Sequence, residues 1–306
     1  MELTFDTLDC ILRECNLQTI DKILAMNKML RNQIQKHRRH YARLPVKIVK
    51  IEPDVSCSCY RWTIELRQDC YKFVNVPPHQ IDRINLSQFA PRIFIFSCFS
   101  RNDPMCYDKI FNEIPKEWFR EIKHVEIQSD ENEKTKSFQN EKLELFEPLS
   151  SLRIEGFVAF SKIGEILKLM QNIEYLAILP QNENEIETNE DDINYIIEEA
   201  KNLSFLDLRN IKHIYSSEKL IDFLKNASFA DSTVLNFEEW PTNGEMIYRF
   251  LKEETEIQES CYLPISMFHE DAPPILPHRY SFKFRNTLFM ITFWKDQIIN
   301  DPRLLR

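Results

Sequence analysis

The chain has 306 residues, of which 43% are hydrophobic and 12% aromatic, so it can bury a sizeable core as one large domain or two smaller ones. Its net charge of −9, from 48 Asp and Glu against 39 Lys and Arg, argues against a broad nucleic-acid or anionic-membrane surface and favours a protein partner. No apolar run approaches the ~20 residues that cross a bilayer, and the acidic first residues are unlike a secretory signal. We therefore expect a cytoplasmic or nuclear protein that binds neither nucleic acid nor membranes.

The scarcity of glycine argues against nucleotide chemistry. Gly156, Gly164 and Gly244 are the three glycines of the chain, whereas phosphate-binding loops need several within about six residues. The Ser, His and Asp residues form no GxSxG or HExxH motif. We expect no enzymatic activity and no cofactor. Catalysis by residues that only the fold brings together is kept as a third hypothesis.

The cysteines and the acidic stretch do not indicate a metal site. Eight scattered cysteines without a secretory signal are typical of reduced thiols. The densest cluster is Cys57, Cys59 and Cys70 with His79, but the first two alternate with serine in an expected strand or hairpin tip, whereas zinc needs four converging ligands. The acidic residues 183–192 are interpreted as a loop and a helix N-terminus, where the dipole favours carboxylates. We therefore expect no bound metal.

The first 40 residues are expected to form a compact helical unit of about three short helices. Their apolar residues recur at helical rather than alternating spacing. They are Leu3, Leu8, Ile11, Leu12, Ile20, Ile23, Leu24, Met26, Leu30 and Ile34. A basic stretch at residues 36–43 ends this unit, because cations suit a helix C-terminus.

Strands are expected next and again at the end of the chain. Tyr60, Trp62, Ile64 and Leu66 alternate with polar residues, which is typical of a half-buried strand. Together with residues 46–52 and 71–76 this strand predicts an antiparallel meander within residues 41–80. Residues 280–285 and 288–293 predict a β-hairpin, which forms a cap within residues 261–306.

An internal repeat occupies the middle of the chain. The pattern apolar-x-x-apolar-x-apolar begins at Ile81, Ile122, Leu149, Ile173 and Leu203, so successive starts lie 41, 27, 24 and 30 residues apart. Leucine-rich repeats have a period of about 20–29 residues. Helical patterns at residues 163–170, 193–200 and 220–224 separate the later copies, which predicts an α/β fold with a parallel sheet and helices on its outer face. We therefore predict an irregular leucine-rich-repeat-like solenoid over residues 81–260.

The N-terminal unit resembles an F-box. Its early aliphatic positions are filled by Leu3, Leu8, Ile11, Leu12, Leu17 and Ile20, and its later signature by Met26, Asn27, Lys28 and Leu30. Thr4 stands where the F-box usually has proline, and Leu30 where it has tryptophan. A box of this kind followed by strands and leucine-rich-like repeats is similar to the F-box proteins that are greatly multiplied in nematodes.

The resemblance implies that the chain is a substrate receptor of a ubiquitin ligase. In that family the box binds a Skp adaptor, through it a cullin, and the remainder captures a protein substrate. It implies adaptor binding by Leu3, Leu8, Ile11, Leu12, Ile20, Met26 and Leu30. The alternative is a leucine-rich-repeat-like scaffold whose helical N-terminus is only a cap, since the ends of repeat arrays need capping. Under that alternative the apolar N-terminal residues are all buried, whereas a receptor leaves some exposed.

The alternate positions of the repeat strands are predicted to bind the substrate within residues 41–306. Because side chains on a strand alternate between faces, these positions point away from the apolar core. They are His124, Glu126, Arg153, Glu155, Tyr175, Phe205, Asp207 and Arg209, which we call the repeat face. Aromatic residues and arginine are frequent anchors of protein interfaces, although any exposed sheet face carries charges and tyrosine.

Overall fold

The computed structural model of the chain describes residues 12, 15, 17–26, 28, 31–32, 34, 43–54, 59–66, 73–76, 86–98, 111–129, 142–181, 186–214, 216–239, 244–262 and 278–295. These residues form a mixed α/β structure in which most paired strands are parallel. The chain divides into two compact units, Met1–Ile122 (unit 1) and Lys123–Arg306 (unit 2), and each is considered by itself. The sequence had instead suggested a boundary after residue 40.

A helical segment begins the described part of unit 1. Helix α2 spans Leu17–Met26, where the apolar spacing predicted a helix. Leu12, Ile20 and Ile34 are buried together, with Cys15 and Ile23 packed against them. This part of the chain therefore has a small apolar core of its own.

Unit 1 also contains the predicted meander. Strands β1 (Leu44–Asp54), β2 (Cys59–Leu66) and β3 (Phe73–Val76) pair in order and antiparallel, as the alternation around Trp62 and Ile64 predicted. Strand β4 (Phe89–Cys98) pairs with β1 in parallel. Helix α5 (Lys116–Phe119) is fixed to it because the buried Trp118 donates its Nε1–H to the Phe89 carbonyl at 2.9 Å.

The prediction of a strand in the first repeat copy, which begins at Ile81, is wrong at Leu86, the residue of this copy that the structure describes. Leu86 begins a 3-10 helix, η3 (Leu86–Gln88), rather than ending a strand. Strand β4 starts only after this turn, and its buried Phe94 and Phe96 form the alternating apolar face. Ile81 and Ile84 lie outside the described residues. The match at Leu86 therefore arose from apolar residues in a turn.

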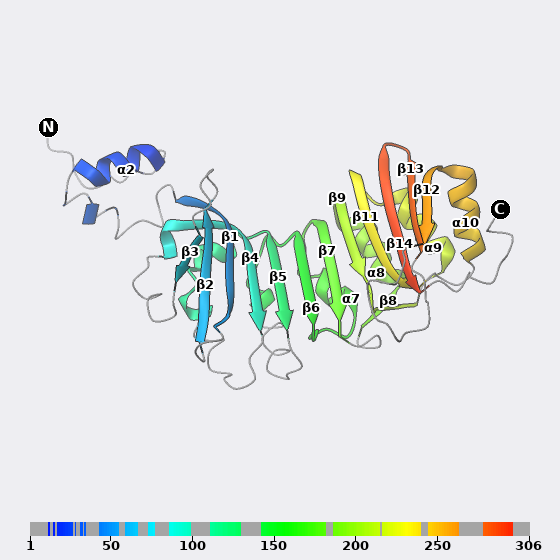
Figure 1. The fold of residues 1–306 in the computed structure, drawn as a ribbon, viewed down its shortest axis with the longest axis horizontal. Helices are drawn as coiled ribbons and strands as arrows, with labels where there is room; N and C mark the ends of the chain where they lie inside the picture. Colours follow the sequence, from blue (N-terminus) through cyan, green and yellow to red (C-terminus); the bar gives the residue numbers. More distant parts are fainter. Residues whose placement is uncertain are drawn as a thin grey trace. The chain divides into compact units, whose positions relative to one another are not determined.

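Unit 2 is built on a sheet whose described strands follow the order β12-β13-β14-β11-β9-β7-β6-β5. The last six of these are consecutive parallel neighbours, drawn as arrows in one direction in Figure 1. Their bounds are β5 His124–Ser129, β6 Ser151–Gly156, β7 Ile173–Pro180, β9 Ala200–Leu208, β11 Phe229–Glu239 and β14 Thr287–Lys295. The sheet thus positions several strand ends side by side.

The remaining strands of this sheet are antiparallel. Strand β13 (His278–Phe284) forms the predicted hairpin with β14, turning at Arg285, whose φ is 56°. Strand β12 (Glu256–Tyr262) pairs with β13. The sequence did not predict β11, β12 or the parallel pairing of β14 with β11.

Four predicted repeat copies lie in register within unit 2. Val125, Leu152, Leu176 and Leu206 are mutual neighbours across β5, β6, β7 and β9, and β11 adds Leu235 to the row. Two residues later, Ile127, Ile154 and Ile178 are neighbours across β5, β6 and β7, and Leu208 is a neighbour of Phe237 across β9 and β11. All of these side chains are buried. The strand prediction is therefore confirmed for these copies.

Helices cover the apolar rows. Helices α7 (Ile163–Leu167), α8 (Glu190–Glu199), α9 (Ser217–Asn226) and α10 (Gly244–Glu254) each bury an apolar stripe, and the first three are drawn behind the sheet in Figure 1. The N-cap Asn189 and Asp192 form a reciprocal capping box at α8, beside a short parallel pair of β8 (Glu187–Asn189) and β10 (Lys212–Ile214). Within the described ranges, no helix is long and apolar enough to cross a membrane.

Candidate functional site

The repeat face is the side of the unit 2 sheet opposite the buried rows. Strand β5 alternates between half-buried and buried positions, and His124 and Glu126 are both half-buried. Arg153, Glu155, Tyr175, Phe205 and Arg209 are half-buried as well, whereas Asp207 is buried. The structure therefore brings all the predicted substrate-binding residues onto one face.

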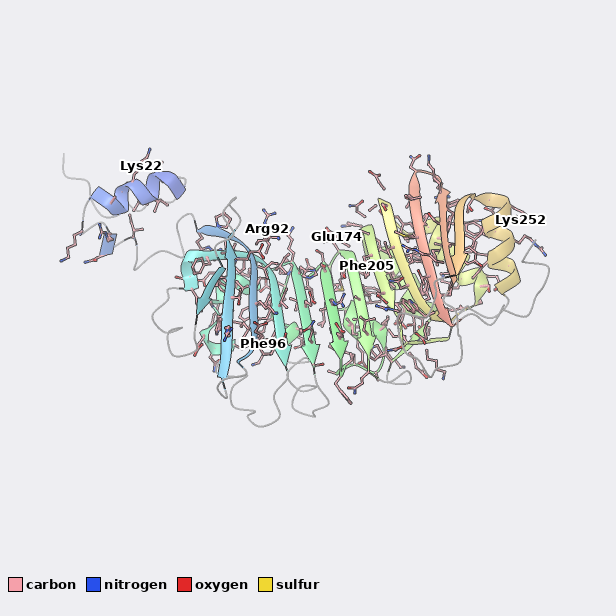
Figure 2. The ribbon with its side chains drawn as sticks, in the orientation of Figure 1. Lys22, Arg92, Phe96, Glu174, Phe205 and Lys252 are labelled. Atoms are coloured by element: carbon pink, nitrogen blue, oxygen red, sulfur yellow. The ribbon has the colours of Figure 1, made fainter. Side chains whose placement is uncertain are left out.

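Three of these residues form an aromatic strip across the face. The rings of Tyr175 and Phe205 stack with centroids 4.5 Å apart, and the His124 ring meets Tyr175 edge-on at 5.6 Å. Phe205, labelled in Figure 2, belongs to β9 and lies opposite Tyr175 of β7. The imidazole Nδ1 of His124 shares a hydrogen bond with the hydroxyl of Ser151, which lies on β6 between His124 of β5 and Tyr175 of β7. The strip is thus ordered before any partner arrives.

A charged row runs beside the aromatic strip. Arg153 lies between two carboxylates, with Nε 3.5 Å from Glu126 Oε1 and Nη2 3.2 Å from Glu155 Oε2. Burial lowers the pKa of Arg153, but hydrogen bonds to Tyr175 and Glu155 outweigh it and hold that pKa above the ordinary value. One cation is therefore shared by two acidic side chains and is tied to the aromatic strip.

Asp207 and Arg209 form a second, fixed ion pair. Arg209 donates from Nε to Asp207 Oδ1 and from Nη2 to Asp207 Oδ2, both at 2.9 Å. Asn236 of β11 donates its Nδ2–H to the same carboxylate at 3.2 Å. The guanidinium of Arg209 also lies over the Trp294 ring, 4.7 Å from its centroid. A bidentate pair with these further contacts holds Arg209 in one orientation.

A hollow opens at the carboxyl ends of the parallel strands, the edge at which open α/β sheets bind ligands. Its volume is about 550 Å³. The described residues that line it are Glu155, Gly156, Leu179, Pro180, Gln181, Arg209, Asn210, Glu238 and Trp294, and we call it the strand-end hollow. It adjoins the repeat face, since Glu155 and Arg209 belong to both.

Sequence reasoning missed most of this lining. Glu238 lies on β11, which was not predicted, and Trp294 lies on β14, whose pairing with β11 was not predicted. A signal did exist in the residues that directly follow each repeat strand, such as Gln181 and Asn210, because the ends of parallel strands meet at one edge. The site residues from β11 and β14 had no such signal.

His124 lies on the repeat face beside Ser151 and Arg153. Burial, and then the charge of Arg153, lower the pKa of His124, so its ring holds a proton less readily than a free imidazole does. Within the part of the chain that the structure describes, its ring contacts Ser151 and Tyr175 and pairs with no carboxylate, the group that orients a catalytic histidine. Among the described residues, no group of three or more His, Cys, Asp and Glu could hold a metal ion. Of the cysteine cluster near residue 57, the structure describes Cys59, in β2.

The residues expected to bind the adaptor are described only in part. Leu12 and Ile20 are 1% and 0% exposed, so both belong to the helical core of this segment. Leu3, Leu8, Ile11 and Leu30 lie outside the described residues, as does the side chain of Met26. The adaptor contact therefore stays a prediction for these positions.

Comparison with known proteins gave no relative from which a function could be transferred. No protein-family model matches the chain, and neither a curated protein nor a solved structure matches it.

Proposed function

We propose that the chain is the substrate-recognition subunit of a Skp–cullin–F-box ubiquitin ligase. It acts by bringing a protein substrate to the ligase, which raises the effective concentration of the two, and performs no chemistry of its own. The observation that supports this proposal most is the repeat face, where a stacked aromatic strip and two oriented arginines lie opposite the helix-covered side of the sheet. Aromatic and arginine side chains of this kind are frequent energetic anchors of protein interfaces.

The proposal assigns a part to each region of the chain. Residues 1–40 are the F-box that binds the Skp adaptor, and residues 41–306 hold the substrate. The in-register aliphatic rows of unit 2 support a degenerate leucine-rich-type repeat, with the C-terminal hairpin as its cap. Such a ligase subunit would work in the cytoplasm or the nucleus.

The second candidate is a repeat scaffold whose helical N-terminus is only a cap. It is favoured by the mutual burial of Leu12, Ile20 and Ile34, because a cap has no need of an exposed apolar face. The two candidates predict different behaviour of the chain from which residues 1–40 have been removed. A receptor without them loses the adaptor but keeps its fold, whereas a scaffold without its cap exposes apolar surface and aggregates.

Co-purification with a Skp adaptor tests the proposal. The full chain should elute with the adaptor as one complex on size exclusion, and the chain lacking residues 1–40 should elute alone and monodisperse. Replacing Leu8 and Ile11 by aspartate should abolish the complex, since each buried apolar anchor contributes about 2 kcal/mol or more. The matched control places aspartate at Leu145 and Leu288, which are 42% and 38% exposed in unit 2, and should leave the complex intact.

A further inference from the structure

We propose that the strand-end hollow binds a long cationic side chain, an arginine or a lysine carried by a protein substrate. This inference rests on the proposed function and deepens it, because it names the chemistry that the substrate presents. The volume of about 550 Å³ lies within the range of roughly 300–1,000 Å³ that is usual for ligand pockets. One extended side chain with part of its flanking backbone therefore fits.

The lining combines the two chemistries that such a side chain needs. Leu179, Pro180 and Trp294 present apolar surface, whereas Glu155 and Glu238 present carboxylates. Lysine and arginine have the complementary construction, since an apolar methylene stem carries a charged head. The Glu155 side chain is 47% exposed, so an incoming cation can reach it.

The charges around the hollow sum to an acidic site despite its arginines. Arg209 is neutralised by the buried Asp207 beneath it, and Arg153 is shared by Glu126 and Glu155. Adding Glu238 gives four carboxylates against two guanidinium groups among these side chains. An anionic ligand would meet this excess of negative charge, whereas a cationic one would be attracted by it.

The rim of the hollow is held in place by Asn210. Its backbone N–H donates to Glu238 Oε2 at 2.9 Å and its Nδ2–H to the Pro180 carbonyl at 3.0 Å, which connects the ends of β11 and β7. Asn210 adopts a left-handed backbone with φ of 62° to do so. The contact of Arg209 with Trp294 shows in addition that the indole accepts a guanidinium. Fixed carboxylate and aromatic groups reduce the entropy that binding costs.

Fluorescence anisotropy with the full chain tests this assignment. The probe is a labelled seven-residue Gly/Ser peptide with one central arginine, compared with matched peptides that carry lysine or the neutral isostere citrulline. The charged peptides should bind about tenfold or more tightly than the citrulline peptide, as is usual for charge-assisted contacts. Equal binding of the citrulline peptide would overturn the proposal, as would preference for a glutamate peptide.

Substitutions locate the binding in the hollow. Glu155→Gln should weaken the arginine peptide about fivefold or more, and Trp294→Leu should do so more than Trp294→Phe. The matched control Glu174→Gln changes an exposed carboxylate of β7, labelled in Figure 2, that does not line the hollow, and should have no effect. Circular dichroism confirms that each variant is folded. Loss of binding in Glu174→Gln but not in Glu155→Gln would refute the location.

A competition arm distinguishes a protein-borne cation from a free one. N-acetyl-arginine amide should displace the peptide only weakly, because it lacks the flanking backbone. If it binds as tightly as the peptide, the assignment to a protein substrate is wrong. The Skp adaptor is absent from these peptide titrations, so the two experiments are independent. If the adaptor does not bind, the peptide titrations still test the hollow. If the peptide does not bind, the adaptor assignment is unaffected.

Discussion

Alanine at Gly156 should strongly destabilise unit 2. Gly156 ends β6, pairs with Ser129 of β5 and Pro180 of β7, and has φ of 94°. A Cβ there would lie 1.9 Å from the Ser129 carbonyl oxygen and 3.0 Å from its carbon. Both atoms are backbone in a parallel sheet, so neither can rotate away.

The expected cost follows from two contributions. A left-handed backbone costs an L-residue roughly 1–2 kcal/mol, and overpacking of a rigid site costs about 1–3 kcal/mol. Together they predict a loss of about 3 kcal/mol in the free energy of unfolding. For a unit of this size each kcal/mol lowers Tm by about 2–4 °C, so Tm should fall by roughly 6–12 °C.

Thermal and urea unfolding followed by circular dichroism measure this loss. The matched control is Gly164→Ala, whose Cβ would lie 2.7 Å from Asp192 Oδ1, a side-chain rather than a backbone atom. Alanine favours the helix by about 1 kcal/mol over glycine, which offsets part of the cost of shifting the capping carboxylate of Asp192, so this variant should lose less stability than Gly156→Ala. Unchanged unfolding of Gly156→Ala would refute the strand register at the hollow.

Three further predictions concern the face and the N-terminus. Alanine at Tyr175 or Phe205 removes one ring of the stacked pair, so substrate capture should weaken about tenfold or more in a binding assay. The far-UV circular dichroism spectrum should stay unchanged. Unchanged capture would exclude the aromatic strip from the interface. Burial, and next Arg153, lower the pKa of His124, so the unfolded chain takes up its proton more readily and stability should fall as pH drops below about 6.5. Thermal unfolding should show a weaker fall for His124→Gln. The chain that lacks residues 1–40 should stay monodisperse in light scattering. Aggregation of this truncated chain would favour the alternative in which the N-terminus is a cap.

The strands of unit 2 could be predicted where local pattern and tertiary pairing agree. Leu152, Leu176 and Leu206 belong to copies of one spaced motif, and their alignment across three parallel strands follows from that repetition. Alternation then placed Arg153 and Tyr175 on the opposite face without further information. Arg209 follows directly after the end of β9 and still reaches back to Asp207, two residues before it.

The strand-end hollow could not be predicted in the same way. Its Trp294 wall exists because β14 returns to pair with β11 in parallel, and that long-range pairing leaves no local pattern. Strand β11 begins at Phe229, but Asp231, Ser232 and Thr233 follow within its first five residues, and their polarity hides the strand from a search for apolar spacing. Conversely, Leu86 satisfied the motif within a 3-10 turn, because apolar spacing alone does not specify a strand.

Calorimetric titration of the full chain with a purified Skp adaptor measures the proposed adaptor contact itself. A substrate receptor should form a complex of one chain with one adaptor with a Kd of about 1 μM or lower, which corresponds to about −8 kcal/mol. The variant with aspartate at Leu8 and Ile11 should give no binding heat, while the control with aspartate at Leu145 and Leu288 should bind normally. If the folded full chain gives no binding heat and forms no complex on size exclusion, it is not a Skp-binding receptor.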